Sequence, residues 1–315
     1  MMDMKVQPGI MDIAPYVGGG SDIDGAEEII KLSSNEGALG PSPEASETYA
    51  ALQRELHRYP DGECTALRHA IGDVHGVDPA GVVCGSGSDE LISLLCQSYA
   101  GPGEEVVYSQ HGFLMYPISA KAAGATPVAA PETDLTADVD ALLAAVTDKT
   151  RILFLANPNN PTGTYLPADE VIRLRDGLRD DVLLVIDAAY AEYVERADYT
   201  SGAELVETHE NVVMTRTFSK IYGLGGIRLG WAYCSGSVVD VLHRVRGPFN
   251  VNGAAQAAGT AAVRDATFTN RVQAHNAKWL PWTRDRLMNL GLFATDSVGN
   301  FVLVCFNGLA DKNAE

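Results

Sequence analysis

The sequence predicts an α/β fold built around a mostly parallel sheet that is buried on both faces. Between residues 81 and 214, short apolar runs alternate with longer amphipathic stretches, as strands and helices do in such folds. The runs are largely apolar, which is typical of strands that helices cover on both sides. The length of 315 residues is enough for one large domain or two smaller ones.

An arm rich in Gly, Pro and Ser runs through Pro43 and is expected to be extended, with short strands such as residues 30–33. The first helix is expected at residues 44–56, where the apolar spacing is helical, and the Tyr-Pro-Asp-Gly turn at residues 59–62 ends it. Further helices are expected at residues 65–75, 89–99, 115–123 and 168–178. Strands are expected at residues 81–84, 105–108, 126–129, 151–155, 182–186 and 212–214.

The alternation of strands and helices ends after residue 252. Two helical stretches are expected there, at residues 254–262 and 269–290, with Pro281 interrupting the second. Residues 300–306 are expected to form a strand without a sheet partner, which would leave an exposed edge. We therefore expect a large domain over residues 44–262 and a small domain formed by residues 1–43 and 263–315.

Composition excludes several classes of partner. The 41 acidic residues outnumber the 23 basic ones, and the net charge of −18 argues against binding to nucleic acid or to an anionic membrane. Five scattered cysteines without a CxxC pair fit a reduced, cytoplasmic protein. The seven histidines form no ligand cluster, so no metal site is expected. No apolar run is long enough to span a bilayer or to act as a signal core.

The most informative stretch is residues 215–231, where Lys220 lies among small hydroxylic residues and precedes a glycine run and Arg228. A lysine amine bonds to the aldehyde of pyridoxal 5′-phosphate when its surroundings leave part of it neutral. Thr217, Ser219 and Arg228 are expected to bind the phosphate, and the glycines let the backbone approach the ligand. The alternative is a surface lysine in a flexible glycine-rich loop, which is the better interpretation of a bare Ser-Lys pair.

Other polar residues also come directly after predicted strands, where open parallel sheets bind their ligands. Asp187 is suited to keep a proton on the ring nitrogen of pyridoxal phosphate, although Asp at such a position is also common as a helix cap. Asn157 begins a turn, Asn-Pro-Asn-Asn-Pro-Thr-Gly. Residues 85–90 are a weak dinucleotide motif, but a helix N-terminus at that place attracts a phosphate.

From Tyr16 to Phe301 the sequence resembles the histidinol-phosphate aminotransferases, a family of fold-type I pyridoxal-phosphate enzymes. Residues 215–231 resemble the family most closely, followed by residues 157–163 and 187–190. The resemblance implies a fold-type I cofactor domain with a smaller α/β domain. It also implies the reaction of L-histidinol phosphate with 2-oxoglutarate to give imidazole-acetol phosphate and L-glutamate, in histidine biosynthesis. The partners would then be a small-molecule amino donor and a 2-oxo acid.

The resemblance assigns the catalytic and ring-binding roles. Lys220 would hold pyridoxal 5′-phosphate and then move a proton as general base and acid. Asp187 would keep the ring nitrogen charged, and Tyr190 and Asn157 would contact the phenolate oxygen of the cofactor. Phe113 would stack on the ring, and its alternative in the same segment is Tyr116.

The remaining assignments concern the phosphate, the substrate and the assembly. Tyr59 would reach across a homodimer interface to the cofactor phosphate of the neighbouring subunit, so that the active site is shared. The cofactor phosphate would also bind Ser86, Gly87 and Ser88. The substrate would bind Tyr16, Asn35 and Asn300.

Two points are left open by the sequence. Members of the family continue beyond the equivalent of Glu315 with an arginine that binds the substrate's carboxylate or phosphate, so we expect an intact cofactor domain and an incomplete substrate site. The chain could then be a related enzyme, an aromatic-amino-acid aminotransferase or a threonine-phosphate decarboxylase. It could also be a protein that binds the cofactor but has lost catalysis.

Overall fold

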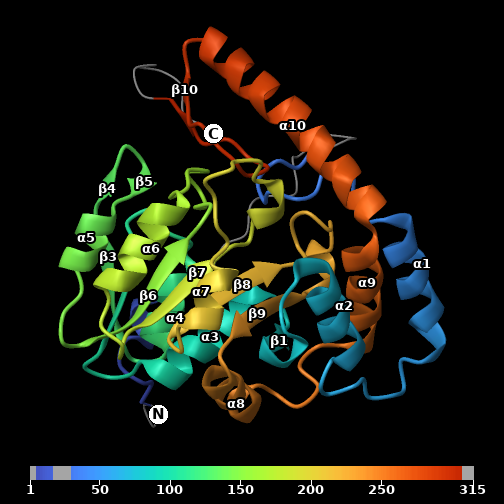
Figure 1. Ribbon diagram of the computed structural model, residues 1–315, viewed down its shortest axis with the longest axis horizontal. Helices are drawn as coiled ribbons and strands as arrows, with labels where there is room; N and C mark the ends of the chain where they lie inside the picture. Colours follow the sequence, from blue (N-terminus) through green and yellow to red (C-terminus); the bar gives the residue numbers. More distant parts are fainter. Residues whose placement is uncertain (1–4, 17–29, 307–315) are drawn as a thin grey trace.

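The computed structural model describes residues 5–16 and 30–306, and its centre is a seven-stranded sheet (Figure 1). Its strand order is β1-β9-β8-β7-β6-β2-β3. The pairs β3–β2, β2–β6, β6–β7 and β7–β8 are parallel, whereas β9 runs antiparallel to both β8 and β1. This confirms the prediction of a mostly parallel sheet. The strands are β1 Val82–Gly85, β2 Glu105–Ser109, β3 Thr126–Ala130, β6 Thr150–Ala156, β7 Leu183–Asp187, β8 Val212–Thr217 and β9 Gly230–Cys234.

Helices cover both faces of the sheet, as the uniformly apolar strands require. On one face lie α3 (Ser88–Tyr99), α4 (Met115–Ala122) and α8 (Gly236–Val245). On the other face lie α2 (Thr65–His75), α5 (Val139–Ala144), α6 (Ala168–Gly177), α7 (Ala203–Thr208) and α9 (Gly253–Arg264). Alternate strand residues feed the two cores, so that Val185 packs on the first face and Ile186 on the second.

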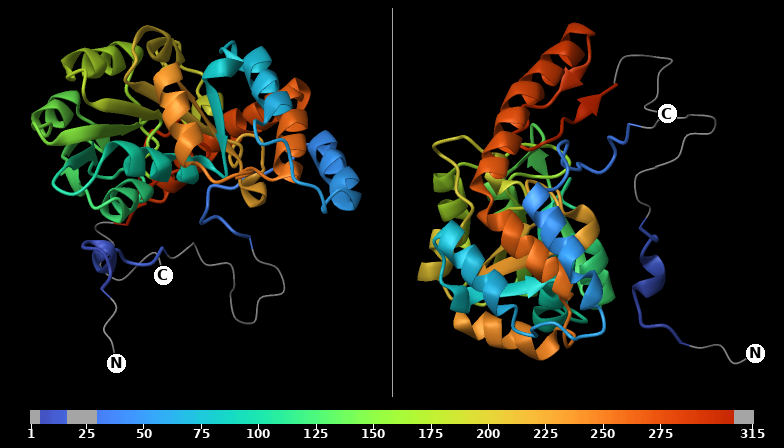
Figure 2. Two further views of the ribbon diagram at one scale, coloured as in Figure 1. Left: turned by 90° about the horizontal axis from the view of Figure 1, so that it is seen from below. Right: turned by 90° about the vertical axis from the view of Figure 1, so that its right-hand side faces the viewer.

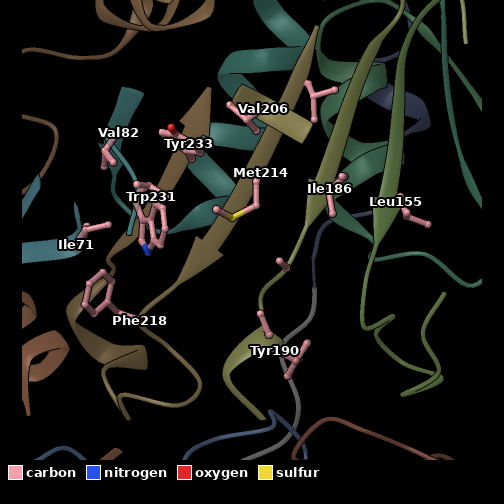
Figure 3. Packing of buried hydrophobic residues seen from close by; sticks show 14 of the residues in the cluster. Ile71, Val82, Leu155, Ile186, Tyr190, Val206, Met214, Phe218, Trp231 and Tyr233 are labelled. Carbon is pink, nitrogen blue, oxygen red and sulfur yellow. The ribbon is translucent and has the colours of Figure 1, made fainter. Parts of the chain in front are cut away.

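Figure 3 shows part of the second core, in which Leu155, Ile186, Met214 and Trp231 come from four neighbouring strands. All four side chains are fully buried. Burial of one such side chain stabilises the fold by about 1.5–3 kcal/mol. The sheet is therefore held firmly in place. The polar residues at the carboxyl ends of its parallel strands consequently have fixed positions.

Capping residues mark where several helices begin. Ser42 accepts a hydrogen bond from the Ala45 amide at 3.1 Å and starts α1 (Pro43–Ala51). Asn252 caps α9 and Asp265 caps α10 (Ala266–Asn289) in the same way. The first helix is shorter than predicted, because a 3-10 turn follows it at Leu52–Arg54.

The predictions for the small domain need three corrections. Residues 30–33 form no strand. Helix α10 is not interrupted by Pro281, although a proline removes the hydrogen bond to the carbonyl of Ala277. Both Ala277 and Pro281 are exposed residues. The predicted strand at 300–306 is only β11 (Val304–Cys305), and it does have a partner, β10 (Phe293–Ala294), in an antiparallel pair. Helix α10 and this pair extend away from the main sheet (Figure 2).

Several elements go beyond the expectation from the sequence: β9, α5, α7, α8 and the hairpin of β4 (Glu132–Thr133) and β5 (Thr136–Ala137). No helix within residues 5–16 and 30–306 has both the length and the apolar character to cross a membrane. The same residues contain no group of three or more His, Cys, Asp or Glu arranged to hold a metal ion.

Candidate active site

A cavity of about 1170 Å³ lies at the carboxyl ends of the parallel strands, bounded also by the arm and by α10. It brings together most of the predicted site residues. Those that line it are Tyr16, Asn35, Ser88, Phe113, Tyr116, Asp187, Tyr190, Thr217, Ser219, Lys220, Arg228 and Asn300. Four others do not line it: Tyr59, Ser86, Gly87 and Asn157.

Lys220 lies just after β8, in a loop that two backbone hydrogen bonds close. The Gly223 amide donates to the Lys220 carbonyl, and the Leu224 amide donates to the Phe218 carbonyl, both at 3.0 Å. Its Nζ donates to the carbonyl of Ser34 at 3.1 Å. Burial lowers the pKa of this amine, against the opposing pull of the Asp89 carboxylate. At a given pH, a larger fraction of this amine is therefore neutral, and so nucleophilic, than in a free lysine.

Asp187 ends β7 and is buried. Tyr116 donates its hydroxyl to Oδ2 at 2.8 Å, and Thr215 donates to Oδ1 at 3.2 Å. Burial raises the pKa of Asp187 to about 6, although both hydrogen bonds act in the opposite direction. The cavity therefore has an ionised carboxylate on its floor above about pH 6.

The two candidate aromatic residues occupy different environments. Tyr116 is fully buried and stacks on Phe154 at 4.5 Å between ring centroids, so its ring belongs to the core. Phe113 is half-buried and meets Tyr116 edge-on at 5.9 Å. This geometry leaves Phe113 the better placed of the two to stack on a ligand ring, and that role stays a prediction.

Tyr190 connects the sheet to the arm and to residues 300–301. Its hydroxyl accepts a hydrogen bond from Asn35 Nδ2 at 3.1 Å, and Asn300 Nδ2 donates to the Asn35 carbonyl at 3.1 Å. Its ring meets Phe301 edge-on at 5.0 Å. Burial raises the pKa of Tyr190, so the phenol keeps its proton and can act as a donor.

Arg228 and the start of α3 form another part of the cavity wall. The guanidinium donates to Asp89 Oδ2 at 2.8 Å and to the Gly225 carbonyl at 3.1 Å. Gly87 has φ +91°, and a Cβ there would lie 2.5 Å from Nη2 of Arg228. Only glycine therefore allows the guanidinium to lie this close to the helix N-terminus, where backbone N–H groups attract a phosphate.

Some predicted residues are engaged elsewhere. Asn157 is buried, and its amide exchanges hydrogen bonds with the backbone of Leu166 at 2.8 and 3.1 Å, so its bond to a phenolate oxygen stays a prediction. Ser86 donates its backbone N–H to Glu90 at 2.6 Å. Tyr59 is 83% exposed and stacks on Phe249.

Thr215 was not among the predicted residues, although it hydrogen-bonds Asp187. The two residues are directly paired across β7 and β8. Side chains alternate between the two faces of β8, so Thr215 lies on the same face as the predicted site residue Thr217. This alternation is the feature of the sequence that points to Thr215.

The residues at the cavity fit pyridoxal 5′-phosphate. They provide a buried amine whose pKa is lowered, an ionisable carboxylate on the cavity floor, and a guanidinium beside hydroxyls at a helix N-terminus. Lys220 suits the aldehyde, Asp187 the ring nitrogen, and Arg228 with Ser88 and Ser219 the phosphate. Such a fold and site define a pyridoxal-phosphate-type α/β enzyme.

Comparison with known proteins identifies the family of the chain. Residues 27–307 match the family described as aminotransferase class I and II. The chain is 63% identical to the histidinol-phosphate aminotransferase of Paramagnetospirillum magneticum, over 98% of this chain and 85% of that protein. It is 62% identical to the histidinol-phosphate aminotransferase of Rhodospirillum rubrum, over 96% and 82% respectively. The chain therefore belongs to the aminotransferase class I and II family, among the histidinol-phosphate aminotransferases.

Solved structures agree with this placement. The histidinol-phosphate aminotransferase of Sinorhizobium meliloti, in complex with pyridoxal-5′-phosphate, superposes with a TM-score of 0.82 at 30% identity, over 86% of this chain and 74% of that one. A mutant aspartate aminotransferase of Thermus thermophilus also gives a TM-score of 0.82, at 20% identity over 98% of this chain and 86% of that one. The second likeness concerns the fold alone.

Proposed function

We propose that this protein is a pyridoxal-phosphate-dependent transaminase that converts L-histidinol phosphate and 2-oxoglutarate to imidazole-acetol phosphate and L-glutamate, in L-histidine biosynthesis. The observation that carries the proposal is the buried amine of Lys220, which lines the same cavity as Asp187 and Arg228. The names of its relatives, with identities of 55–63%, supply the amino donor.

When bound, pyridoxal phosphate supplies an aldehyde for the amino group and a ring that takes up the electron pair of the donor's α-carbon. Lys220 Nζ would take the proton from that carbon as general base and deliver it, as general acid, to the carbon that carried the aldehyde. Asp187 Oδ1 and Oδ2, oriented by Thr215 and Tyr116, hold the proton at the ring nitrogen. Arg228 and Ser88 would bind the phosphate and so limit the movement of the bound cofactor.

The proposal is tested by the visible absorbance of the purified protein, with and without L-histidinol phosphate, beside the variant Lys220→Ala. We expect a cofactor band that disappears with the donor and that the variant lacks. A band that responds to phenylalanine but not to histidinol phosphate would instead identify an aromatic-amino-acid aminotransferase. A band that no donor changes would indicate a protein that only binds the cofactor, and the complete absence of a band would refute the assignment of Lys220.

We further infer a homodimer with a shared site. Tyr59 and Phe249 support it, because two stacked rings with 83% and 43% exposure are typical of an interface that a second copy covers. Sedimentation velocity at several concentrations tests this inference, and a monomer at all of them would contradict it.

We also propose that the domains divide as the sequence suggests, at residues 44–262 against 1–43 and 263–315. The main sheet lies wholly within the first range, and the β10–β11 pair lies within the second. A cytoplasmic location is our proposal as well, supported by five free cysteines, of which four are buried. Fractionation of cells that express the protein tests the location.

A further inference from the structure

A histidine and a glutamate that play no part in the function proposed above form a pair at the cavity. His111 lies in the loop between β2 and α4 and lines the cavity with a side chain that is 44% exposed. Glu132, on β4, has a side chain only 3% exposed. The two side chains meet at 2.7 Å between Nδ1 and Oε2. A buried carboxylate thus stands behind a histidine that faces the cavity.

The contacts of Glu132 fix the orientation of the imidazole. Oε1 accepts from the hydroxyl of Ser109 and from the backbone N–H of His111, the latter at 3.0 Å. An ionised carboxylate only accepts, so Nδ1 of His111 must be the donor to Oε2. Asn159 Nδ2 donates to the His111 carbonyl at 3.3 Å and anchors the same loop from the turn after β6.

The second ring nitrogen is left for a ligand. Within residues 5–16 and 30–306, no hydrogen bond to Nε2 of His111 occurs. A ring whose Nδ1–H points at a carboxylate presents Nε2–H on its other side when it is protonated, because both nitrogens are then donors. Such a donor forms short, charge-assisted hydrogen bonds with phosphate oxygens.

The charges along the cavity favour an anion at this place. A phosphate ester that enters a protein of net charge −18 needs local cationic donors, and these can act together with an arginine of the kind that the resemblance to the family implies. Among the described residues, the basic side chains along the cavity are those of Lys31, His111, Lys220, Arg228 and His275. Lys31 is paired with Glu36 at 3.3 Å, and Lys220 and Arg228 serve the cofactor. Of the two histidines that remain, only His111 has a carboxylate behind it among these residues.

We propose that His111, oriented by Glu132, binds the phosphate group of the amino donor and makes the site select the phosphorylated donor over its unphosphorylated form. This inference rests on the function proposed above, because it takes the donor to be L-histidinol phosphate. Glu132 is then a positioning residue: it touches no substrate and acts only through the imidazole.

The test is a titration of the cofactor absorbance of the loaded protein with L-histidinol phosphate and, separately, with L-histidinol. The variant His111→Asn keeps an amide N–H at the place of Nδ1 and removes Nε2, whereas His111→Gln keeps an N–H near the place of Nε2. We expect His111→Asn to raise the dissociation constant of histidinol phosphate by about 10- to 100-fold and that of histidinol by less than about twofold. His111→Gln should fall between wild type and His111→Asn.

Two further variants separate the proposal from a loop that merely needs anchoring. Glu132→Gln should weaken histidinol phosphate selectively, in the same direction as His111→Asn. His275→Asn, which removes the other histidine along the cavity, should change neither dissociation constant by more than about twofold. An equal loss for both donors in His111→Asn, or a loss for neither, would overturn the proposal.

Inorganic phosphate provides an independent measurement with the intact protein. It should compete with the phosphorylated donor in wild type, at least tenfold more weakly in His111→Asn, and to an intermediate degree in His111→Gln. Equal competition in all three proteins would refute the role of His111. If the wild type does not respond to histidinol phosphate at all, the proposed function itself fails, and this inference fails with it.

Discussion

Replacement of Asp187 by Asn should make the cofactor-free protein more stable while it abolishes the use of the cofactor. The carboxyl group is buried and holds hydrogen bonds from Tyr116 and Thr215. Its burial is nevertheless the larger effect and raises its pKa to about 6 from a value of 3.8. The folded protein without a ligand therefore resists ionisation of this group, and Asn removes the ionisation.

The magnitude follows from the difference between the two pKa values, which corresponds to about 3 kcal/mol. Because the folded pKa lies above the unfolded one, the stability is fully present below pH 3.8 and is lost as the pH rises through about 6. The amide avoids this loss, so the advantage of Asp187→Asn should be near zero at pH 4 and should reach about 3 kcal/mol by pH 8. Both hydroxyls can accept as well as donate, so they can adapt to the amide.

Urea unfolding of the cofactor-free proteins at pH 5, 6, 7 and 8 measures this advantage. Asp181→Asn is a matched control, because Arg179 lowers the pKa of that exposed carboxyl and its removal should give no gain at high pH. A variant that is no more stable than wild type at pH 8, or a gain that does not change with pH, would refute the account of Asp187 as a buried, ionised group. The cofactor band should be weakened or absent in Asp187→Asn.

Two further predictions concern the same site. Tyr116→Phe removes a hydrogen bond that lowers the pKa of Asp187. The midpoint of the pH dependence of cofactor affinity should therefore move to higher pH by about one to two units. An unchanged midpoint in a fluorescence titration would contradict this. Gly87→Ala adds a Cβ 2.5 Å from Arg228 at φ +91° and should raise the cofactor dissociation constant at least about tenfold. Gly236→Ala is the control and should not change it, because the space around Gly236 is open. Equal affinities in the two variants would show that the close approach is unimportant.

The sequence indicates the parallel core well because its strands are largely apolar and several of them, such as β2 and β6, are followed by a helix. It does not reveal β9, whose residues follow the glycine-rich loop directly and pair antiparallel with the preceding strand β8 and with the distant strand β1. The short helices α5 and α7 also escape, since six residues carry little helical periodicity. Pro281 misleads because a proline on an exposed helix face can be accommodated.

The same distinction holds within the site. Lys220, Asp187 and Arg228 can be predicted because they lie in continuous motifs that follow strands. The bond from Thr215 to Asp187 depends on the pairing of β7 and β8. The contact between His111 and Glu132 depends on the parallel pairing of β2 and β3, which brings together residues 21 positions apart. The turn that contains Asn157 is visible in the sequence, but the commitment of its amide to Leu166 is not.

The direction of β9 has a consequence for how the loop of residues 218–229 can change. Since β9 is antiparallel to β8, the loop leaves the sheet at Thr217 and re-enters it at Gly230, two residues paired across neighbouring strands about 4.8 Å apart. Lys220 and Arg228 therefore share one short span that is anchored at both ends. An insertion or deletion in this span would alter the distance between the amine and the guanidinium directly, whereas substitutions that preserve its length would leave that distance intact. We therefore expect natural variation here to change residue types and to conserve loop length.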